Sequence, residues 1–351
     1  MSIIEYGWND YFETEWCKMQ PGGMYPARIV ADYGQMLRVV ADKGELSVNR
    51  PLQKVDNRMQ LAVGDWIGLE DNKMSDLPQV RFVLPRKTKF SRAAAGIEAK
   101  EQIVAANVDT VFLVQSLNRD FNMKRLERYL IAAWDSGAMP VVVLTKADCC
   151  DDIQNKKAIA AAAAPGVEII SISSITGEGM EQIRKYLVPG KTVALLGSSG
   201  VGKSTLLNTL AGKELLKTRE IREDDSRGRH TTTHRELVLL PDGGMVMDTP
   251  GMRVLSLWDS DTGMDIMFGD VEELTNQCRF HDCKHGNEPG CAVRQALECG
   301  KLDIARWESW VKLQKEMAHL EAKKEGRLRL QEKQWGRQIS KFQKEFRKGR
   351  V

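Results

Sequence analysis

The chain has 351 residues, 42% of them hydrophobic and 28% charged, which is enough for two or three domains with buried cores. It contains no run of about 18 apolar residues and no basic start followed by an apolar stretch, which disfavours a membrane span and a secretory signal. We therefore expect a cytoplasmic protein without membrane contact. Seven cysteines, an odd number, argue against a disulfide framework.

The formal net charge of +3 is unevenly distributed. Residues 312–351 contain 13 Lys and Arg against 5 Asp and Glu, whereas the preceding residues are mildly acidic. This basic tail fits either a polyanionic partner or a solvated charged helix, and charge alone does not separate the two.

The first 90 residues predict a short helix and a small barrel. Residues 1–20 carry Trp8, Phe12 and Trp16 at fourfold spacing, which indicates one face of an amphipathic helix used for packing. Residues 21–90 change to short apolar alternations broken by Gly, Asp and Asn, which predict a β-barrel of unspecified type. Its strands are expected at residues 27–31, 36–40, 66–69 and 80–84.

Residues 100–257 alternate short apolar strands with helical stretches, which predicts a mostly parallel sheet covered by helices on both faces. The strands are expected at residues 111–114, 141–144, 167–172, 193–196, 237–240 and 245–247, and the helices at residues 126–133, 180–186 and 204–210. Residues 258–351 are expected to form a last domain, with a loop-rich segment beyond residue 278 and a charged helical stretch from about residue 303.

A phosphate-binding loop pattern follows the strand at 193–196 and precedes a helix. Its glycines allow backbone N–H groups to curl around phosphate oxygens, and the helix directs its positive end to the same place. We expect Lys203 to reach the β- and γ-phosphates and Ser204 to bind Mg²⁺. The expected phosphate-binding residues are Gly197, Ser198, Ser199, Gly200, Val201, Gly202, Lys203, Ser204 and Thr205.

Two loops after successive strands favour guanine as the base. The first resembles the Asn/Thr-Lys-x-Asp box of GTPases, in which the carboxylate of Asp148 would accept hydrogen bonds from guanine N1–H and the exocyclic amino group together. Thr145 replaces the more usual Asn, which loses an amide that ties this loop to the phosphate loop. The second is similar to the loop whose backbone N–H bonds guanine O6. The expected residues are Thr145, Lys146, Ala147, Asp148, Ser173 and Ser174.

An Asp-x-x-Gly pattern and an upstream threonine run predict switch segments. Asp248 is expected to hold Mg²⁺ through a water, and Gly251 to donate its N–H to the γ-phosphate. A second Mg²⁺ ligand is expected from the polar stretch that orders around the γ-phosphate. The candidates are Thr231, Thr232 and Thr233.

Met252 stands where Ras-like enzymes have the Gln that orients the attacking water. Because a thioether cannot do this, intrinsic hydrolysis should be slow unless another group acts. His230 is the nearest candidate by sequence, and a purely structural loop residue is the alternative.

The guanine loops precede the phosphate loop, which is the reverse of the order in ordinary GTPases. The pocket can keep its shape if the old chain ends lay close enough to be joined. We therefore predict a circularly permuted GTPase domain.

Three cysteines and a histidine lie close together near the C-terminus. Three thiolates and one imidazole match a closed tetrahedral structural Zn²⁺ site, which cannot activate water. Free cysteines in a small core are the alternative, with His281 as a competing ligand and Cys299 as a spare thiol. The expected ligands are Cys278, Cys283, His285 and Cys291.

With these motifs in hand, the chain resembles the circularly permuted GTPases of small ribosomal subunit biogenesis, the RsgA/YjeQ family. The motifs include the segment 105–109, the guanine loops, the segment 229–233 and the zinc spacing. The resemblance implies an N-terminal OB-fold barrel, a permuted GTPase domain and a mostly helical zinc domain. It also implies His230 as the catalytic residue.

The resemblance further implies binding to the small (30S) ribosomal subunit and its rRNA late in assembly, with GTP hydrolysis to GDP stimulated by the particle. We expect a monomer. The alternatives are an RNA-binding scaffold that uses guanine nucleotide for stability and a translation-factor-like GTPase on complete ribosomes. Thr145, the aromatic lead and the long basic tail depart from the family pattern.

Overall fold

The computed structural model describes residues 2–51, 60–72, 77–93, 101–118, 120–214, 235–248, 261–286, 288–318 and 321–322. The chain divides into two compact units, one of residues 1–92 with 102–267 and one of residues 93–101 with 268–351. None of the helices within the described ranges is both long and apolar enough to cross a membrane.

Five antiparallel strands form the N-terminal barrel. β1 pairs with both β2 and β4, β3 pairs with β2, β5 pairs with β4, and β3 also lies against β5. This closed order, β1-β2-β3-β5-β4-β1, is a Greek-key connection of the OB-fold type. The strands are β1 (Tyr25–Asp32), β2 (Met36–Ala41), β3 (Gly44–Asn49), β4 (Trp66–Glu70) and β5 (Gln79–Val83). β3, in which Val48 is the one buried residue of six, was not predicted from the sequence.

Helix α1 (Asp10–Lys18) packs against the barrel through aromatic side chains, which confirms the predicted amphipathic helix. The ring centroids of Trp8 and Phe12 lie 4.8 and 5.7 Å from that of the fully buried Trp66. The ring of Trp16 lies 5.5 Å from that of Phe82. Close aromatic pairs of this kind add to the stability that burial provides.

The larger part of the first unit is a parallel sheet, as predicted, and its strand order is β10-β9-β8-β11-β13. β12 pairs antiparallel to β13 at its edge. The strands are β8 (Thr110–Ser116), β9 (Met139–Thr145), β10 (Glu168–Ser171), β11 (Thr192–Leu196), β12 (Arg235–Leu239) and β13 (Met245–Asp248). A separate two-stranded sheet of β6 (Lys89–Ala93) and β7 (Glu101–Ala106) precedes them in the chain and was not predicted.

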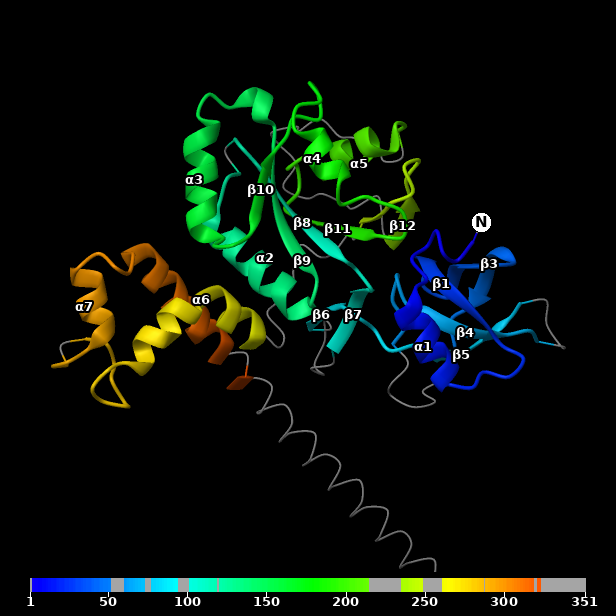
Figure 1. Cartoon of the computed structure of the whole chain (residues 1–351), viewed down its shortest axis with the longest axis horizontal. Coiled ribbons are helices and arrows are strands. Elements are labelled where there is room, and N and C mark those ends of the chain that lie inside the picture. The colour runs from blue at the N-terminus through cyan, green and yellow to red at the C-terminus, as the bar shows by residue number, and fades with distance from the viewer. Residues whose placement is uncertain are drawn as a thin grey trace, which may run out of the picture. The chain divides into compact units, whose positions relative to one another are not determined.

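Helices cover both faces of this sheet (Figure 1). Apolar side chains of α4 and α5 pack with alternate residues of the strands, including Phe112, Val143 and Leu195. α2 and α3 contact the same strands and lie on the other side of the sheet, as in the βαβ units of parallel sheets. The helices are α2 (Met123–Ser136), α3 (Ile153–Ala163), α4 (Met180–Arg184) and α5 (Lys203–Ala211).

The barrel is joined to the sheet edge by strand pairing and by one ion pair. β1 pairs antiparallel with β12, with Ala31 opposite Glu236. The guanidinium of Arg38 on β2 forms an ion pair with the carboxylate of Glu236. The barrel therefore continues the sheet, next to the strand that follows residues 215–234.

Arg28 on β1 is a buried charged residue where the barrel meets the sheet, and it is only 2% exposed. Its guanidinium donates to the carbonyl oxygens of Tyr6, Gly64 and Asn107 and to the hydroxyl of Thr192. Burial lowers the pKa of Arg28 to about 10, so the group stays cationic at neutral pH. A buried cation needs many acceptors, and here they come from the barrel, the linker and the sheet.

The second unit is mostly helical, as predicted. It contains α7 (Ala292–Glu298), a helix at residues 304–318 and the end of α6 (Asp261–Asn276). α6 has non-helical angles at Phe268 (φ −126°, ψ 22°), where the two units divide. The guanidinium of Arg306 binds the carboxylate of Asp270 and lies over the ring of Phe268. Most of the predicted basic tail lies outside the described residues.

Candidate guanine-nucleotide site and metal centre

The phosphate-binding loop has the strand–loop–helix setting that the sequence predicted. The fully buried β11 ends at Leu196, and α5 begins at Lys203. A side-chain carbon on Gly197 would lie 2.3 Å from the carbonyl oxygen of Val114, and Gly202 has φ +99°. Both positions therefore require glycine. The loop is held tightly against β8 at one end and turns sharply into the helix at the other.

Two side chains of the predicted guanine loop reach the phosphate-binding loop. The hydroxyl of Thr145 donates to the carbonyl oxygen of Val201 at 2.5 Å, and the carbonyl oxygen of Gln115 lies 3.2 Å away. The ammonium of Lys146 donates to the carbonyl oxygen of Gly200 at 2.9 Å. Thr145 thus supplies the tie between loops that the sequence comparison with Asn suggested was lost.

Asp148 and Ser173 meet at the other side of this loop. Ser173 Oγ donates to Asp148 Oδ1 at 2.6 Å, and Cys149 Sγ donates to Asp148 Oδ2 at 3.1 Å. These two hydrogen bonds, with Ser173 the larger cause, lower the pKa of Asp148 below its usual range. Asp148 is exposed and its carboxylate is ionised at neutral pH, as guanine recognition requires.

Ser173 is completely buried and also accepts hydrogen bonds from the backbone N–H groups of Ile175 and Thr176. Its hydroxyl therefore orders the second guanine loop as well as Asp148. Ser174 follows in the same turn and is half-buried. Gly177 closes the turn, since its N–H donates to the carbonyl oxygen of Ser173.

The predicted magnesium ligands are only partly within the described residues. Ser204 lies half-buried in the first turn of α5. Asp248 ends β13, opposite Leu195 of the neighbouring β11, which places its backbone beside the start of the phosphate-binding loop. The other predicted switch residues, His230, Thr231, Thr232, Thr233, Gly251 and Met252, lie outside the described residues.

The phosphate-binding loop has further contacts that the sequence did not suggest. Lys203 Nζ donates to the carbonyl oxygens of Gly197 and Ser198. Ser198 Oγ contacts Asp120 and Arg125 at the start of α2. Asp120 and Arg125 could have been suspected from the sequence, because they follow the buried strand β8, in a polar loop and at the start of α2. That loop lies at the same edge of the sheet as the other nucleotide loops.

The four predicted zinc ligands come together in the second unit. Their ligand atoms all lie within 4.8 Å of one another, and Cys278 Sγ lies 3.5 Å from His285 Nδ1 and 3.9 Å from Cys291 Sγ. A tetrahedron of ligands about 2.3 Å from a zinc ion has edges of about 3.8 Å. The side chains of Cys278, Cys283, His285 and Cys291 therefore lie close enough together to hold one metal ion.

Neither of the competing residues joins this cluster. Cys299 Sγ donates instead to the carbonyl oxygen of Ala296, and His281 is exposed. The ring of Trp307 lies edge-on to His285, with centroids 5.3 Å apart. His285 has φ +57°, a left-handed conformation that turns the chain sharply between the ligands.

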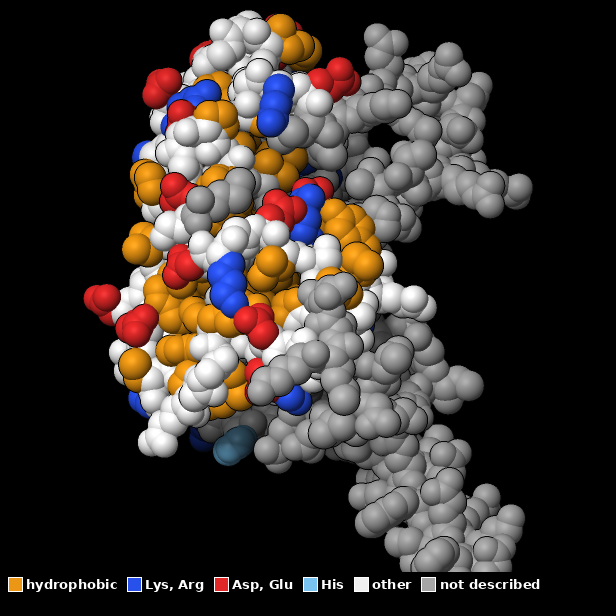
Figure 2. All heavy atoms as spheres, turned by 90° about the vertical axis from the view of Figure 1, so that its right-hand side faces the viewer, with side chains coloured by type: hydrophobic (Ala, Val, Ile, Leu, Met, Phe, Trp, Pro, Cys, Tyr) orange, Lys and Arg blue, Asp and Glu red, His pale blue; other side chains and the backbone are white. Residues whose placement is uncertain are grey.

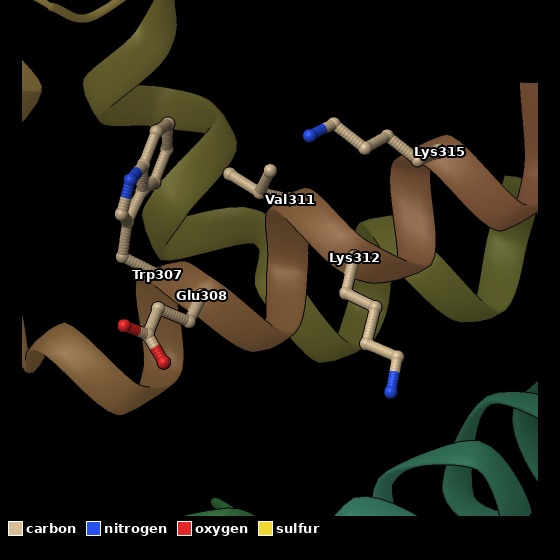
Figure 3. Close-up of a pocket in the computed structure, with 5 residues that line it drawn as sticks. All are labelled: Trp307, Glu308, Val311, Lys312 and Lys315. Atoms are coloured by element: carbon tan, nitrogen blue, oxygen red, sulfur yellow. The ribbon is translucent and has the colours of Figure 1, made fainter.

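A shallow pocket of about 350 Å³ adjoins this cluster on the helix at 304–318. In Figure 3, Trp307, Val311 and Lys315 point to one side of the helix. The pocket contains none of the predicted nucleotide or metal ligands. It is lined by Trp307, Glu308, Val311, Lys312 and Lys315.

The barrel surface has charges of both signs. Figure 2 shows apolar side chains gathered on the barrel side of the first unit, with basic and acidic side chains scattered among them. Arg38, Lys43 and Arg81 each form an ion pair with a carboxylate. This face is therefore not a continuous basic surface.

Comparisons with known proteins identify the family of this chain. The family model for the RsgA GTPase matches residues 83–258. A protein of Listeria innocua called small ribosomal subunit biogenesis GTPase RsgA 1 is 43% identical over 347 residues, covering 97% of this chain and 96% of that protein. The protein called RsgA 1 of Oceanobacillus iheyensis is 46% identical over 288 residues, which is 82% of each chain.

Two solved structures have the same fold. The crystal structure of YjeQ from Thermotoga maritima superposes with a TM-score of 0.60 at 28% identity, covering 83% of this chain and 97% of that one. YloQ, described as a circularly permuted GTPase, gives 0.58 at 23% identity, covering 86% and 96%. The permuted order of nucleotide loops, the fold and the similarity along nearly the whole chain agree: this chain belongs to the RsgA GTPase family.

Proposed function

We propose that the chain hydrolyses GTP to GDP and phosphate and acts in the biogenesis of the small ribosomal subunit. The observation that carries the proposal is the direct hydrogen bonding of the guanine loop to the phosphate-binding loop, from Thr145 to Val201 and from Lys146 to Gly200. Base recognition and phosphate recognition thereby form one site. Relatives similar over nearly the full length are named small ribosomal subunit biogenesis GTPases.

In this site Asp148 would accept from the guanine base, and the stem of Lys146 would lie across it. Lys203 and the start of α5 would bind the phosphates. Mg²⁺ would neutralise charge that develops on the transferred phosphate. The ion would be held by Ser204, by one of Thr231, Thr232 and Thr233, and through water by Asp248, whose oxygen atoms suit a hard cation.

His230 would supply the function that Met252 cannot, by orienting the attacking water. We propose that the small subunit brings this segment into its active arrangement late in assembly, so that GTP hydrolysis acts as a timer. The partner would be the particle and its rRNA, bound by a monomer in the cytoplasm. We expect the basic tail, residues 312–351, to contact the phosphate backbone of the rRNA, because it has an excess of positive charge. The barrel face is less suited to this contact, because its charges are mixed.

The zinc proposal concerns structure rather than chemistry. Four protein ligands would fill the coordination of Zn²⁺, so no position remains for a reacting water. Zinc binding would stabilise the loop-rich segment between α6 and α7, which has few buried side chains of its own.

The test is GTP turnover measured alone, with purified small subunits, with large subunits and with complete ribosomes. We expect small subunits to raise GTP turnover at least about tenfold. Partners that complete the active site of a GTPase typically increase turnover by far more than this. His230→Ala should remove this stimulation and leave GDP affinity unchanged. A rate unaffected by small subunits would instead favour the RNA-binding scaffold, to which Met252 points. Stimulation only by complete ribosomes would favour a translation-factor-like role.

A further inference from the structure

An ion pair at the start of α2 meets the phosphate-binding loop. Arg125 Nη1 lies 2.7 Å from Asp120 Oδ1. Ser198 Oγ donates to Asp120 Oδ2 at 2.6 Å and accepts from Arg125 Nη1 at 2.5 Å. The hydroxyl of Ser198 therefore donates to the negative carboxylate of Asp120 and accepts from the positive guanidinium of Arg125. These two hydrogen bonds fix its orientation.

Ser198 lies at a point in this loop where the backbone is already held by other contacts. Its neighbour Gly197 is packed against the carbonyl oxygen of Val114. The carbonyl oxygen of Ser198 accepts from the ammonium of Lys203. Because both the side chain and the carbonyl group of Ser198 are fixed, the backbone N–H groups that follow it point in a set direction. In a phosphate-binding loop these are the groups that bind phosphate.

The ion pair is itself held in place by its own loop. The side chain of Asn118 accepts from the backbone N–H of Asp120. Asn122 caps α2 by accepting from the backbone N–H of Arg125 at 3.1 Å. Gln115 exchanges two hydrogen bonds with the backbone of Asn122. The two charged side chains therefore begin from a fixed backbone.

We propose that Asp120 and Arg125 are positioning residues that hold the phosphate-binding loop, through Ser198, in the shape that binds the β-phosphate. The side chains of Arg125 and Asp120 are 30% and 35% exposed. An ion pair this exposed contributes little to the stability of a fold. Its contribution to a loop whose N–H groups must point at a ligand is larger, because the loop then loses less freedom on binding.

The pair acts through geometry rather than through its net charge. The carboxylate of Asp120 neutralises the guanidinium of Arg125, so the two together add little attraction for phosphate. Removing either member leaves the other charge beside Ser198 without its partner. This inference rests on the proposed guanine-nucleotide site and names residues that shape it.

The experiment measures GDP and GMP affinity by competition with a fluorescent GDP analogue. GMP lacks the β-phosphate, so a change in loop shape weakens GDP more than GMP. Asp120→Asn and Arg125→Met should each weaken GDP about tenfold and GMP less than twofold, as expected for loss of a charge-assisted hydrogen bond. A general loss of folding would weaken both nucleotides equally.

A double-mutant cycle tests whether the effect passes through Ser198. Asp120→Asn should have less than a twofold effect on GDP in a Ser198→Ala background. The matched control is Arg184→Met, which breaks an exposed ion pair with Asp242 elsewhere in the first unit and should leave GDP affinity within about twofold.

Three results would overturn the inference: equal losses for GDP and GMP, GDP affinity that stays at the wild-type value, or an undiminished effect of Asp120→Asn without the Ser198 hydroxyl. A wild-type protein that failed to bind GDP would contradict the proposed function itself. Wild-type GDP binding with unchanged variants would contradict only the positioning role.

Discussion

The hydroxyl of Thr145 lies 2.5 Å from the carbonyl oxygen of Val201, so the base-recognition loop and the phosphate-binding loop share a hydrogen bond. A threonine hydroxyl is shorter than the asparagine amide more usual here. It reaches because the two loops lie close together here: a side-chain carbon built on Gly202, next to Val201, would be in van der Waals contact with Thr145 Oγ1 at 3.5 Å. The loops are therefore packed closely enough for the smaller group.

Thr145→Val should weaken GDP and GTP binding about tenfold. Valine has nearly the same shape but cannot donate, so the carbonyl oxygen of Val201 loses its partner in a buried position. Isothermal titration calorimetry measures the change. Thr145→Ser keeps the hydroxyl and should stay within about threefold of wild type; equal losses in both variants would show that the hydrogen bond is unimportant.

Asp148→Asn should change the preferred base from guanine to xanthine. The asparagine amide replaces one acceptor with a donor, while xanthine replaces the amino group of guanine with an acceptor. GDP affinity should fall at least about a hundredfold and xanthosine diphosphate should become the tighter ligand. Competition between the two nucleotides measures this preference. A variant that still favoured GDP would place base recognition elsewhere.

Ser173→Ala should move the acid limit of GDP binding to higher pH. In the proposed site GDP binding requires the Asp148 carboxylate, and the hydrogen bond from Ser173 is the main cause that holds the pKa of Asp148 below its usual range. Affinity is therefore complete above that pKa and is lost as pH falls through it. Removing the donor raises the pKa, so loss begins at a higher pH.

Cys149→Ser is the control for this pH profile, because serine still offers a donor to Asp148 Oδ2. GDP affinity of all three proteins is compared as pH is lowered from neutrality. The expectation would be contradicted if Ser173→Ala weakened binding by the same factor at every pH, since that pattern reports lost contact rather than a changed pKa.

The proposed nucleotide loops and the clustering of the four Cys and His side chains could be predicted because each depends on a short stretch of sequence. Lys203 and Ser204 follow their glycines directly, and the four metal ligands fall within residues 278–291. Their local order is enough to propose the chemistry. The parallel sheet was predictable for a similar reason, since buried strands have continuous apolar runs.

The contacts that connect these parts could not be predicted, because they join residues far apart in the chain. Arg28 contacts Asn107 and Met245, which are 79 and 217 residues away. In the sequence it is one arginine in the otherwise apolar segment 27–31. Ser198 likewise meets Asp120 across 78 residues. Only the packing of the sheet determines which polar residues meet.

Arg28→Met should lower the free energy of unfolding by about 3 kcal/mol or more, because several buried carbonyl oxygens lose their donor together. Urea unfolding at pH 7 measures this change. Arg81→Met breaks only an exposed ion pair with Glu70 on the same barrel and should cost less than about 1 kcal/mol. If the two variants lost similar amounts of unfolding free energy, Arg28 would not stabilise the contact between the barrel and the sheet.

Cys283→Ser should abolish zinc binding and destabilise the second unit, whereas Cys299→Ser should do neither. Cys283 is one of the four clustered ligands, and Cys299 lies outside the cluster with its thiol directed to the carbonyl oxygen of Ala296. Metal analysis should find about one zinc ion per chain in wild type and in Cys299→Ser. Chelation should reduce the helical circular dichroism of both, because metal binding in small zinc modules contributes on the order of 10 kcal/mol to folding. Full zinc content in Cys283→Ser, or none in wild type, would show that the four side chains cluster for another reason.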